Sequence, residues 1–226
     1  MYMKRFILFL SMVAVLAGCN KGKQPGFNEK DLVGWWVCTA AYQNGIQVKT
    51  PVSTFIIQSD HQAYLSYTTG RWSFNKWALY GENLALWTSD DSWDVADKSI
   101  IKNLDGKHMT WLEVYGEDEY EDMYTDIGKI LPGKWKISWP SRKHIVTIEA
   151  FENYPWEGSS SWYGEDGTTL SGKFGWGLGT SDGSTVIYFG TVADSWHDVL
   201  CIKQVVSDTE LATVSSANAE VSMVKL

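Results

Sequence analysis

The sequence has few of the residues on which metal sites, disulfide frameworks and covalent catalysis depend. Its 226 residues include three cysteines and four histidines. The histidines show no spacing typical of a metal site, and no Gly-x-Ser-x-Gly nucleophile motif is present. Cys38 and Cys201 lie in apolar, strand-like runs without a recognisable histidine partner, which favours buried free thiols. We therefore expect no enzyme, no metal and no cofactor.

Positive charge is scarce as well. Nineteen Lys and Arg stand against 27 Asp and Glu, so the formal net charge is −8. An acidic chain is a poor partner for nucleic acid and lacks the basic surface that docks on anionic lipid. The acidic run at 116–122 lacks the spacing of an EF-hand calcium loop, and we interpret it as a solvated hairpin.

Long apolar segments are also missing. The run Phe6–Gly18 is shorter than the roughly 20 residues that a membrane-spanning helix needs. It follows the basic pair Lys4 and Arg5, as the apolar region of a secretion signal does. Its end, Leu16-Ala17-Gly18-Cys19, resembles the lipobox of bacterial lipoproteins. That resemblance implies cleavage before Cys19, acylation of its thiol and anchoring in a lipid bilayer.

The polar segment after Cys19 is expected to be a flexible tether. Asn20 stands where lipoproteins retained at the inner membrane commonly have Asp. Lys21 and Lys23 depart from the acidic signal that follows the cysteine in surface-exported lipoproteins of Bacteroidetes. These residues favour an outer-membrane lipoprotein that faces the periplasm.

Tryptophan and tyrosine, by contrast, are abundant, with 13 and 11 copies. Gly34-x-Trp36 recurs as Gly133-x-Trp135, and DSWDV at 91–95 recurs as DSWHDV at 194–199. Further matches keep the same order at offsets of 99 to 103 residues, which chance does not supply. We therefore predict two homologous domains that pack against each other across a very short join. The predicted division is a signal peptide at 1–18, a lipidated tether at 19–30, and domains at 31–128 and 129–226.

Each repeat is predicted to consist of strands. Residues 63–67 alternate, with Ala63, Leu65 and Tyr67 on one face, and residues 144–151 place Val146, Ile148 and Ala150 on one face. Turn signals separate such runs: Asn44-Gly45, Thr69-Gly70, Gly81-Glu82-Asn83, Asp105-Gly106, Asp166-Gly167 and Asp182-Gly183. Seven or eight short strands per repeat predict an all-β fold of two small antiparallel up-and-down β-barrels, closed so that no edge stays unpaired.

A strand-opening Gly-x-Trp followed by a meander resembles the lipocalin/calycin type of barrel. More narrowly, the chain resembles the lipocalin-like lipoproteins common in Bacteroidetes. These share a lipobox, a short tether, an L-x-G-x-W motif and a final hairpin, seen here as IIKNLDGKHMTWLEV (100–114) and more loosely as CIKQVVSDTELATV (201–214). The resemblance implies that Trp36 and Trp135 each close one end of a barrel. It also implies an envelope protein that binds a small apolar or amphipathic molecule, or a partner protein.

The aromatic residues are the candidate binding residues. The segment 153–167 combines aromatics with Ser and Gly in a loop-like setting and is the best candidate contact surface. The candidate set is Trp77, Trp87, Trp93, Trp156, Trp162, Tyr163, Trp176 and Trp196. Strand-like runs place the following in the core: Trp35, Trp36, Trp72, Trp111 and Trp135.

Three functions remain open from the sequence. A ligand carrier needs an open, apolar barrel interior. A carbohydrate-binding module needs two or three coplanar exposed rings. A structural or interaction protein would have filled barrels and an exposed aromatic patch for a protein partner.

Overall fold

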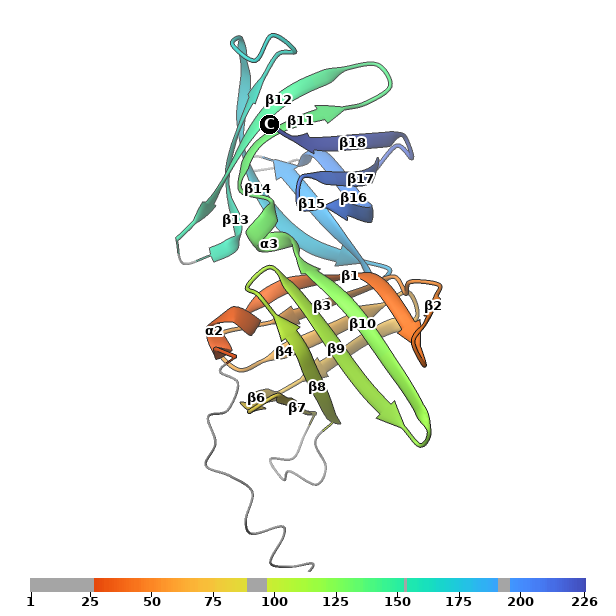
Figure 1. Cartoon of the computed structure of the whole chain (residues 1–226). Helices are drawn as coiled ribbons and strands as arrows, with labels where there is room; N and C mark the ends of the chain where they lie inside the picture. Colours follow the sequence, from red (N-terminus) through yellow and green to blue (C-terminus); the bar gives the residue numbers. More distant parts are fainter. Residues whose placement is uncertain (1–26, 89–96, 153, 191–195) are drawn as a thin grey trace, which may run out of the picture.

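The computed structural model describes residues 27–88, 97–152, 154–190 and 196–226 (Figure 1). These described residues are nearly all β, with 69% in strands and 4% in helices. Two antiparallel barrels follow each other along the chain, which confirms the predicted fold class. Among the described residues, no helix is both long enough and apolar enough to cross a membrane. The signal peptide and Cys19 lie outside the described residues.

The first barrel contains ten antiparallel strands in the order β5-β4-β3-β1-β10-β9-β8-β7-β6, with β2 beside β1. Its strands are β1 (Gly34–Gln43), β2 (Ile46–Val48), β3 (Ser53–Ile57), β4 (Ala63–Tyr67), β5 (Gly70–Phe74), β6 (Lys76–Tyr80), β7 (Asn83–Trp87), β8 (Asp97–Leu104), β9 (His108–Tyr115) and β10 (Asp118–Asp126). Only Asn75 separates β5 from β6, so together they act as one bent strand that joins β4 to β7.

The second barrel is closed by hydrogen bonds, because β18 pairs with β11. Its strands are β11 (Gly133–Ser138), β12 (Lys143–Phe151), β13 (Tyr154–Tyr163), β14 (Leu170–Ser181), β15 (Ser184–Gly190), β16 (Trp196–Ser207), β17 (Glu210–Ser215) and β18 (Glu220–Lys225). The long strand β14 pairs with β13 through its first part and with β15 through its second. This single strand therefore joins its two neighbours in the second barrel, as β5 and β6 together join β4 to β7 in the first.

A short helix precedes the first strand of each barrel, α2 (Glu29–Leu32) in one and α3 (Ile127–Ile130) in the other. Trp36 Nε1 donates to the carbonyl oxygen of Leu32 at 2.8 Å, and Trp135 Nε1 donates to that of Leu131 at 2.6 Å. Both tryptophans are fully buried. The same four-residue spacing in both barrels supports the predicted duplication and places each tryptophan at a barrel end.

In each barrel, a lysine at or just after the end of the last strand lies over the ring of this buried tryptophan. The Nζ atoms of Lys129 and Lys225 each lie 5.4 Å from the ring centroid, of Trp36 and Trp135 respectively. Each ammonium also donates to a backbone carbonyl in or beside the short helix, Lys129 to Asp31 and Lys225 to Ile130. Cation–π contact and the hydrogen bond together hold the chain end against the start of its own barrel.

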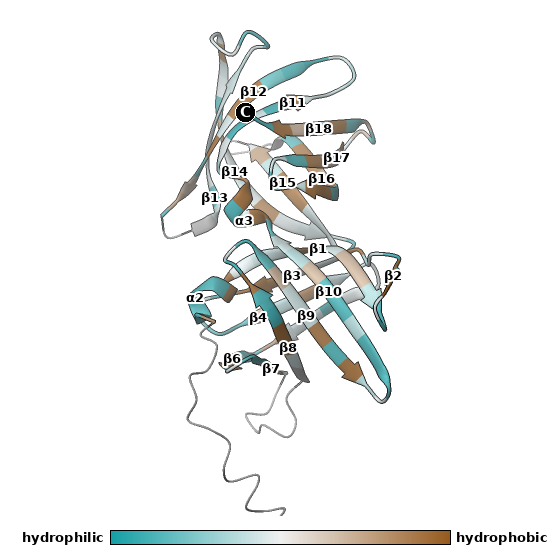
Figure 2. Cartoon of the chain, viewed as in Figure 1, coloured by the Kyte–Doolittle hydropathy of each residue, from teal (hydrophilic) through white to brown (hydrophobic). Residues whose placement is uncertain are grey.

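Burial follows the predicted alternation. In β4, Ala63 and Leu65 are buried and Tyr67 is half-buried; in β12, Val146 and Ile148 are buried. Hydrophobic and hydrophilic colours accordingly alternate along the strands (Figure 2). The predicted turns also lie between paired strands: Asn44-Gly45 joins β1 to β2, and Asp182-Gly183 joins β14 to β15. All four of these turn residues have positive φ, as tight hairpins of this kind require.

Two expectations for single segments are wrong. Trp72, expected in the core, is 59% exposed, because among the described residues β5 pairs with β4 alone and lies at the end of the sheet. The segment 153–167, expected to be a loop, forms β13 over Tyr154–Tyr163. Gly158 permits this pairing, since a Cβ atom there would collide with the carbonyl oxygen of Glu149 on β12.

The two barrels are in direct contact, as the short join predicts. Thr54 Oγ1 donates to the carbonyl oxygen of Gly183 at 2.8 Å, and Trp35 Nε1 donates to Thr185 Oγ1 at 2.9 Å. The ring of Trp35 also packs edge-on against Trp156, with centroids 5.7 Å apart. The β14–β15 hairpin of the second barrel thus rests on β1 and β3 of the first.

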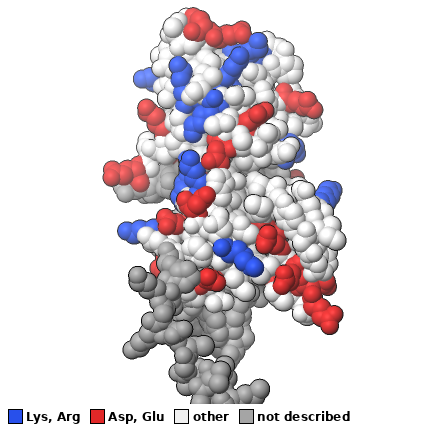
Figure 3. All heavy atoms as spheres, in the orientation of Figure 1, with Lys and Arg blue, Asp and Glu red and all other residues white. Residues whose placement is uncertain are grey.

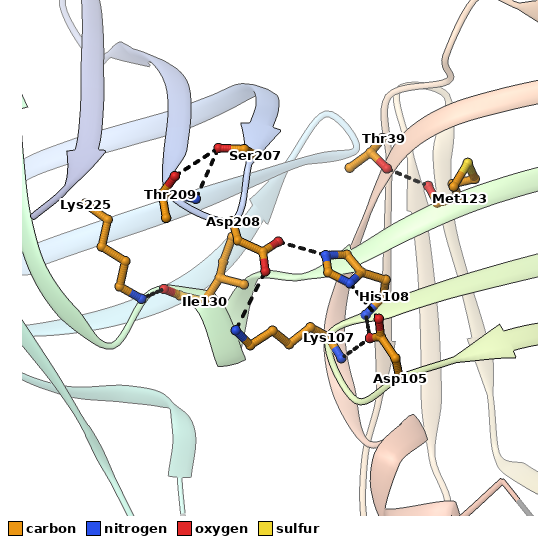
Figure 4. A network of polar contacts seen from close by, with 10 residues as sticks. All are labelled: Thr39, Asp105, Lys107, His108, Met123, Ile130, Ser207, Asp208, Thr209 and Lys225. Atoms are coloured by element: carbon orange, nitrogen blue, oxygen red, sulfur yellow. Dashed lines mark hydrogen bonds and ion pairs between the residues drawn. The ribbon is translucent and has the colours of Figure 1, made fainter.

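A second contact between the barrels is ionic (Figure 4). His108 Nε2 lies 2.7 Å from Asp208 Oδ1, and Nδ1 of the same ring lies 3.0 Å from Asp105 Oδ2. Lys107 Nζ adds a longer contact to Asp208 at 3.7 Å. Burial alone would lower the pKa of His108, but the hydrogen bonds to Asp105 and Asp208 outweigh it and raise that pKa.

Candidate functional site

The inner face of the first barrel changes from apolar to polar along its length. On β9 the inward positions run from Met109 and Trp111, both buried, to Glu113 and Tyr115. On β10 they run from buried Tyr124 to half-buried Asp122. Because side chains two residues apart on a strand share a face, Glu113 and Asp122 point into the barrel. The polar end lies toward the β9–β10 turn, far from the second barrel (Figure 1).

Hydroxyl groups surround the two carboxylates. Ser99 Oγ donates to Glu113 Oε1 at 3.2 Å, and Tyr115 OH donates to Glu113 Oε2 at 3.1 Å. Tyr124 OH donates to Asp122 Oδ2 at 3.4 Å. Glu113 and Asp122 form no ion pair with any residue that the structure describes. We call Tyr67, Glu113, Tyr115, Asp122 and Tyr124 the tyrosine–carboxylate cluster.

The cluster draws residues from three strands of the barrel, β4, β9 and β10. Burial raises the pKa of Asp122 to about 6, and the negative charge of Glu113 adds to the rise. Burial also raises the pKa of Tyr67, with further contributions from Glu113 and Asp122. Tyr67 belongs to β4, and two strands separate β4 from β10 in the sheet. Its side chain therefore lies near the carboxylates across the interior.

A buried indole N–H lies beside the cluster. Trp111 is 5% exposed, and its Nε1 has no hydrogen-bond partner among the described residues. Its ring packs against Phe55 and Tyr124, with centroids 4.8 Å and 6.1 Å apart. Trp111 also stands directly opposite Asp122 in the β9–β10 register, so the two side chains are neighbours on the inner face. An unpartnered buried N–H destabilises a fold by about 1–3 kcal/mol.

Both cysteines within the described residues are free, Cys38 buried and Cys201 half-buried. Burial raises the pKa of the Cys38 thiol to about 12, with a further contribution from Asp122. The thiolate is the reactive form of cysteine, so Cys38 is an inert core residue at neutral pH.

The corresponding part of the second barrel is filled with rings. The Trp162 centroid lies 5.1 Å from Phe189 and 5.9 Å from both Phe174 and Trp139. Trp139 Nε1 is buried without a partner among the described residues, as Trp111 Nε1 is. The charges differ, however, because Arg142 lies over Trp139 and pairs with the buried carboxylate of Asp198. Here the buried carboxylate already has its cation.

The candidate tryptophans serve mainly to build the barrels. Trp77 Nε1 donates to the carbonyl oxygen of Gln58, and Trp176 Nε1 donates to that of Glu149, both at 2.9 Å. Of the other candidates, Trp87 and Trp162 are buried, and Trp156 and Tyr163 are half-buried. Trp93 and the side chain of Trp196 lie outside the described residues. The structure brings none of the described candidates into the tyrosine–carboxylate cluster, and their role in binding stays a prediction.

Sequence reasoning missed the cluster, although one signal was available. In 108–115 the sequence alternates, so Glu113 shares a face with Met109 and Trp111. A carboxylate at an inward position of an alternating strand is unusual and could have been marked. The convergence of Asp122 and Tyr67 on it has no counterpart in sequence spacing.

A cavity between the barrels and the possibility of a metal site provide weaker candidates for a functional site. A cavity of about 220 Å³ lies between the barrels, lined by residues of β1, β15 and β16, including Val37, Thr185 and Gln204. It is smaller than the roughly 300–1,000 Å³ of common small-molecule sites. Within the part of the chain that the structure describes, no group of three or more His, Cys, Asp or Glu side chains is arranged to hold a metal ion.

Residues 3–20 match the prokaryotic membrane lipoprotein lipid attachment site. No curated protein matches the sequence. The matched residues include Cys19, so the chain is a bacterial lipoprotein that carries two barrels in tandem and is anchored to a membrane by its acylated cysteine.

Proposed function

We propose that this lipoprotein is a non-catalytic binding protein of the cell envelope that takes a small amphipathic molecule at the polar end of its first barrel. The tyrosine–carboxylate cluster carries the proposal. Sites for small ligands combine apolar walls with a few convergent polar groups, and here rings of Trp111 and Phe55 lie below two half-buried carboxylates. Trp111 Nε1, for which the described part of the chain supplies no acceptor, offers a donor to such a ligand.

The other binding functions have less support among the described residues. The two exposed rings in contact, Tyr115 and Tyr120, meet at 66° and make no flat platform for a sugar. In the segment 153–167, Trp162 is buried and Trp156 packs against Trp35 between the barrels. The ring-filled interior of the second barrel suits a structural role better than a carrier role.

A non-catalytic role agrees with the chemistry of the titratable groups. Cys38 is held as a neutral thiol, and the hydroxyl groups around Glu113 already donate to it. Asn20 and the lysines that follow favour attachment to the outer membrane, with the barrels in the periplasm.

The proposal can be tested with the mature chain, residues 19–226, carrying Cys19→Ser so that it stays unlipidated. The probe is N-phenyl-1-naphthylamine, a neutral dye that accepts energy from nearby tryptophan. We expect saturable binding with energy transfer that falls sharply in Trp111→Phe and changes little in Trp162→Phe, the matched variant of the second barrel. Absence of saturable binding, or a loss of transfer in Trp162→Phe alone, contradicts a site in the first barrel.

A further inference from the structure

We infer that the ligand of the first barrel is a small organic cation, an amine with an aromatic or apolar body, whose ammonium group is held by Glu113 and Asp122. This inference rests on the proposed function and names its ligand class. The ammonium would lie inside the barrel against the inner face of β9 and β10, and the body of the ligand would lie against Tyr67, Trp111 and Tyr124.

The charges inside the first barrel favour a cation. Two carboxylates face the same interior from adjacent strands, and no described cation pairs with either of them. In the second barrel, the buried carboxylate of Asp198 has Arg142 as its partner. Charges withdrawn from water are normally paired, so these two half-buried carboxylates differ from Asp198 in having no cation among the described residues.

The hydrogen-bonding capacity of the carboxylates favours an ammonium group in particular. Ser99, Tyr115 and Tyr124 each donate once to the two carboxylates. A carboxylate accepts about four hydrogen bonds, so several acceptor positions remain. An ammonium group carries three donors and no acceptor, which complements them. Trp111 Nε1 adds a donor, which suits an ether, hydroxyl or carbonyl oxygen on the same ligand.

The surrounding wall favours an organic cation over a metal ion. Tyr67, Trp111 and Tyr124 lie on the same inner face as the carboxylates, and aromatic faces attract organic cations as well as covering apolar groups. A metal ion would use carboxylates but not rings, and no metal-binding group is found among the described residues. Acidic residues also surround the nearby β9–β10 turn, visible at the lower right of Figure 3. Their field would draw a cation toward this end.

The ionisation of Asp122 supports the same ligand. Its carboxyl faces Glu113 from β9, Cys38 from β1, Tyr67 from β4 and Tyr124 on its own strand. Burial and Glu113 raise its pKa to about 6, so the surrounding protein opposes the negative charge. A bound cation would favour that charge. If Asp122 must be ionised to bind, affinity should fall about tenfold from pH 7.5 to pH 5.

Three probes with one ring and different head groups test the inference. Phenethylamine, 2-phenylethanol and phenylacetate are each titrated into the unlipidated mature chain, by displacement of N-phenyl-1-naphthylamine. We expect phenethylamine to bind at least about tenfold more tightly than the alcohol, and phenylacetate to bind least. If the alcohol or the acid binds as tightly as phenethylamine or more tightly, the inference of a cationic ligand is overturned, while the proposed binding function stands. If neither the dye nor any probe binds, both are overturned.

Conservative variants locate the effect. Asp122→Asn and Glu113→Gln keep an acceptor for the hydroxyl groups that now donate to them. Each should weaken phenethylamine binding by about tenfold or more while leaving 2-phenylethanol binding unchanged. Glu119→Gln, which removes an exposed charge from the outer face of β10, is the matched control and should have little effect. An unchanged phenethylamine affinity in folded Asp122→Asn and Glu113→Gln overturns the inference.

Discussion

Gly183→Ala should disturb the contact between the two barrels. Gly183 ends the β14–β15 turn with φ of +80°, a conformation that alanine adopts at a cost. A Cβ atom there would lie 2.5 Å from Tyr67 C, 2.6 Å from Thr68 N and 2.6 Å from Val52 O, all in the first barrel. These are backbone atoms, so no side-chain rotation can relieve the overlap. The hairpin would have to move and stretch its bond from Thr54.

The expected loss of stability has two parts. A left-handed conformation costs a residue with a Cβ atom about 1–2 kcal/mol. Forcing a methyl group into a filled contact costs about 1–3 kcal/mol more. Gly45 provides the control, because it ends the β1–β2 turn with φ of +76° and a Cβ atom added there would have no neighbour within 4 Å. Gly45→Ala should therefore lose only the backbone part.

Urea unfolding of the unlipidated mature chain measures both variants. We expect Gly183→Ala to lose about 2–5 kcal/mol of unfolding free energy and Gly45→Ala about 1–2 kcal/mol. The difference isolates the overlap between the barrels. Equal losses would mean that the hairpin does not press on the first barrel, and the close packing of Gly183 on β3 and β4 would be refuted.

Single contacts give three other predictions. Asp122→Asn should raise the free energy of unfolding at pH 7.5 by about 1–2 kcal/mol after allowance for solvent screening, because a carboxyl whose folded pKa is raised destabilises the fold at higher pH. Urea titrations should show that this gain vanishes below about pH 4. A gain that persists there would contradict ionisation of Asp122 as its cause. His108→Gln should lower the unfolding free energy by about 0.2–1 kcal/mol at pH 5.5, where the protonated ring joins Asp105 to Asp208. The difference in unfolding free energy between the two proteins should narrow as the pH rises through the raised pKa of His108. A loss of stability that does not depend on pH would exclude ionisation of His108 as its origin. Cys19→Ser should move the protein from the membrane fraction to the soluble fraction and abolish its labelling by radioactive palmitate, whereas continued labelling would place the lipid elsewhere.

Local chemistry determined much of what could be predicted from the sequence. Alternation in 63–67 and 144–151 marks strands because successive side chains point to opposite faces. Asn44-Gly45 and Asp182-Gly183 mark hairpins because both residues of each pair accept positive φ. The recurrence of Gly-x-Trp revealed two barrels, since each copy needs the same contact with the helix before it.

Tertiary structure decided whatever depends on distant segments. Thr54 has the polar side chain of an outward position, yet it is buried, because the β14–β15 hairpin of the second barrel contacts it through Gly183 and Thr185. Trp72 follows the alternation of a core residue but is exposed at a strand edge. The sequence placed Tyr67 on the inward face of its strand, but the acidic run that contains Asp122 was expected to be a solvated hairpin, whereas Asp122 is half-buried within β10. Only barrel closure and strand register, which depend on contacts far apart in the chain, decided that Tyr67, Glu113 and Asp122 lie near one another.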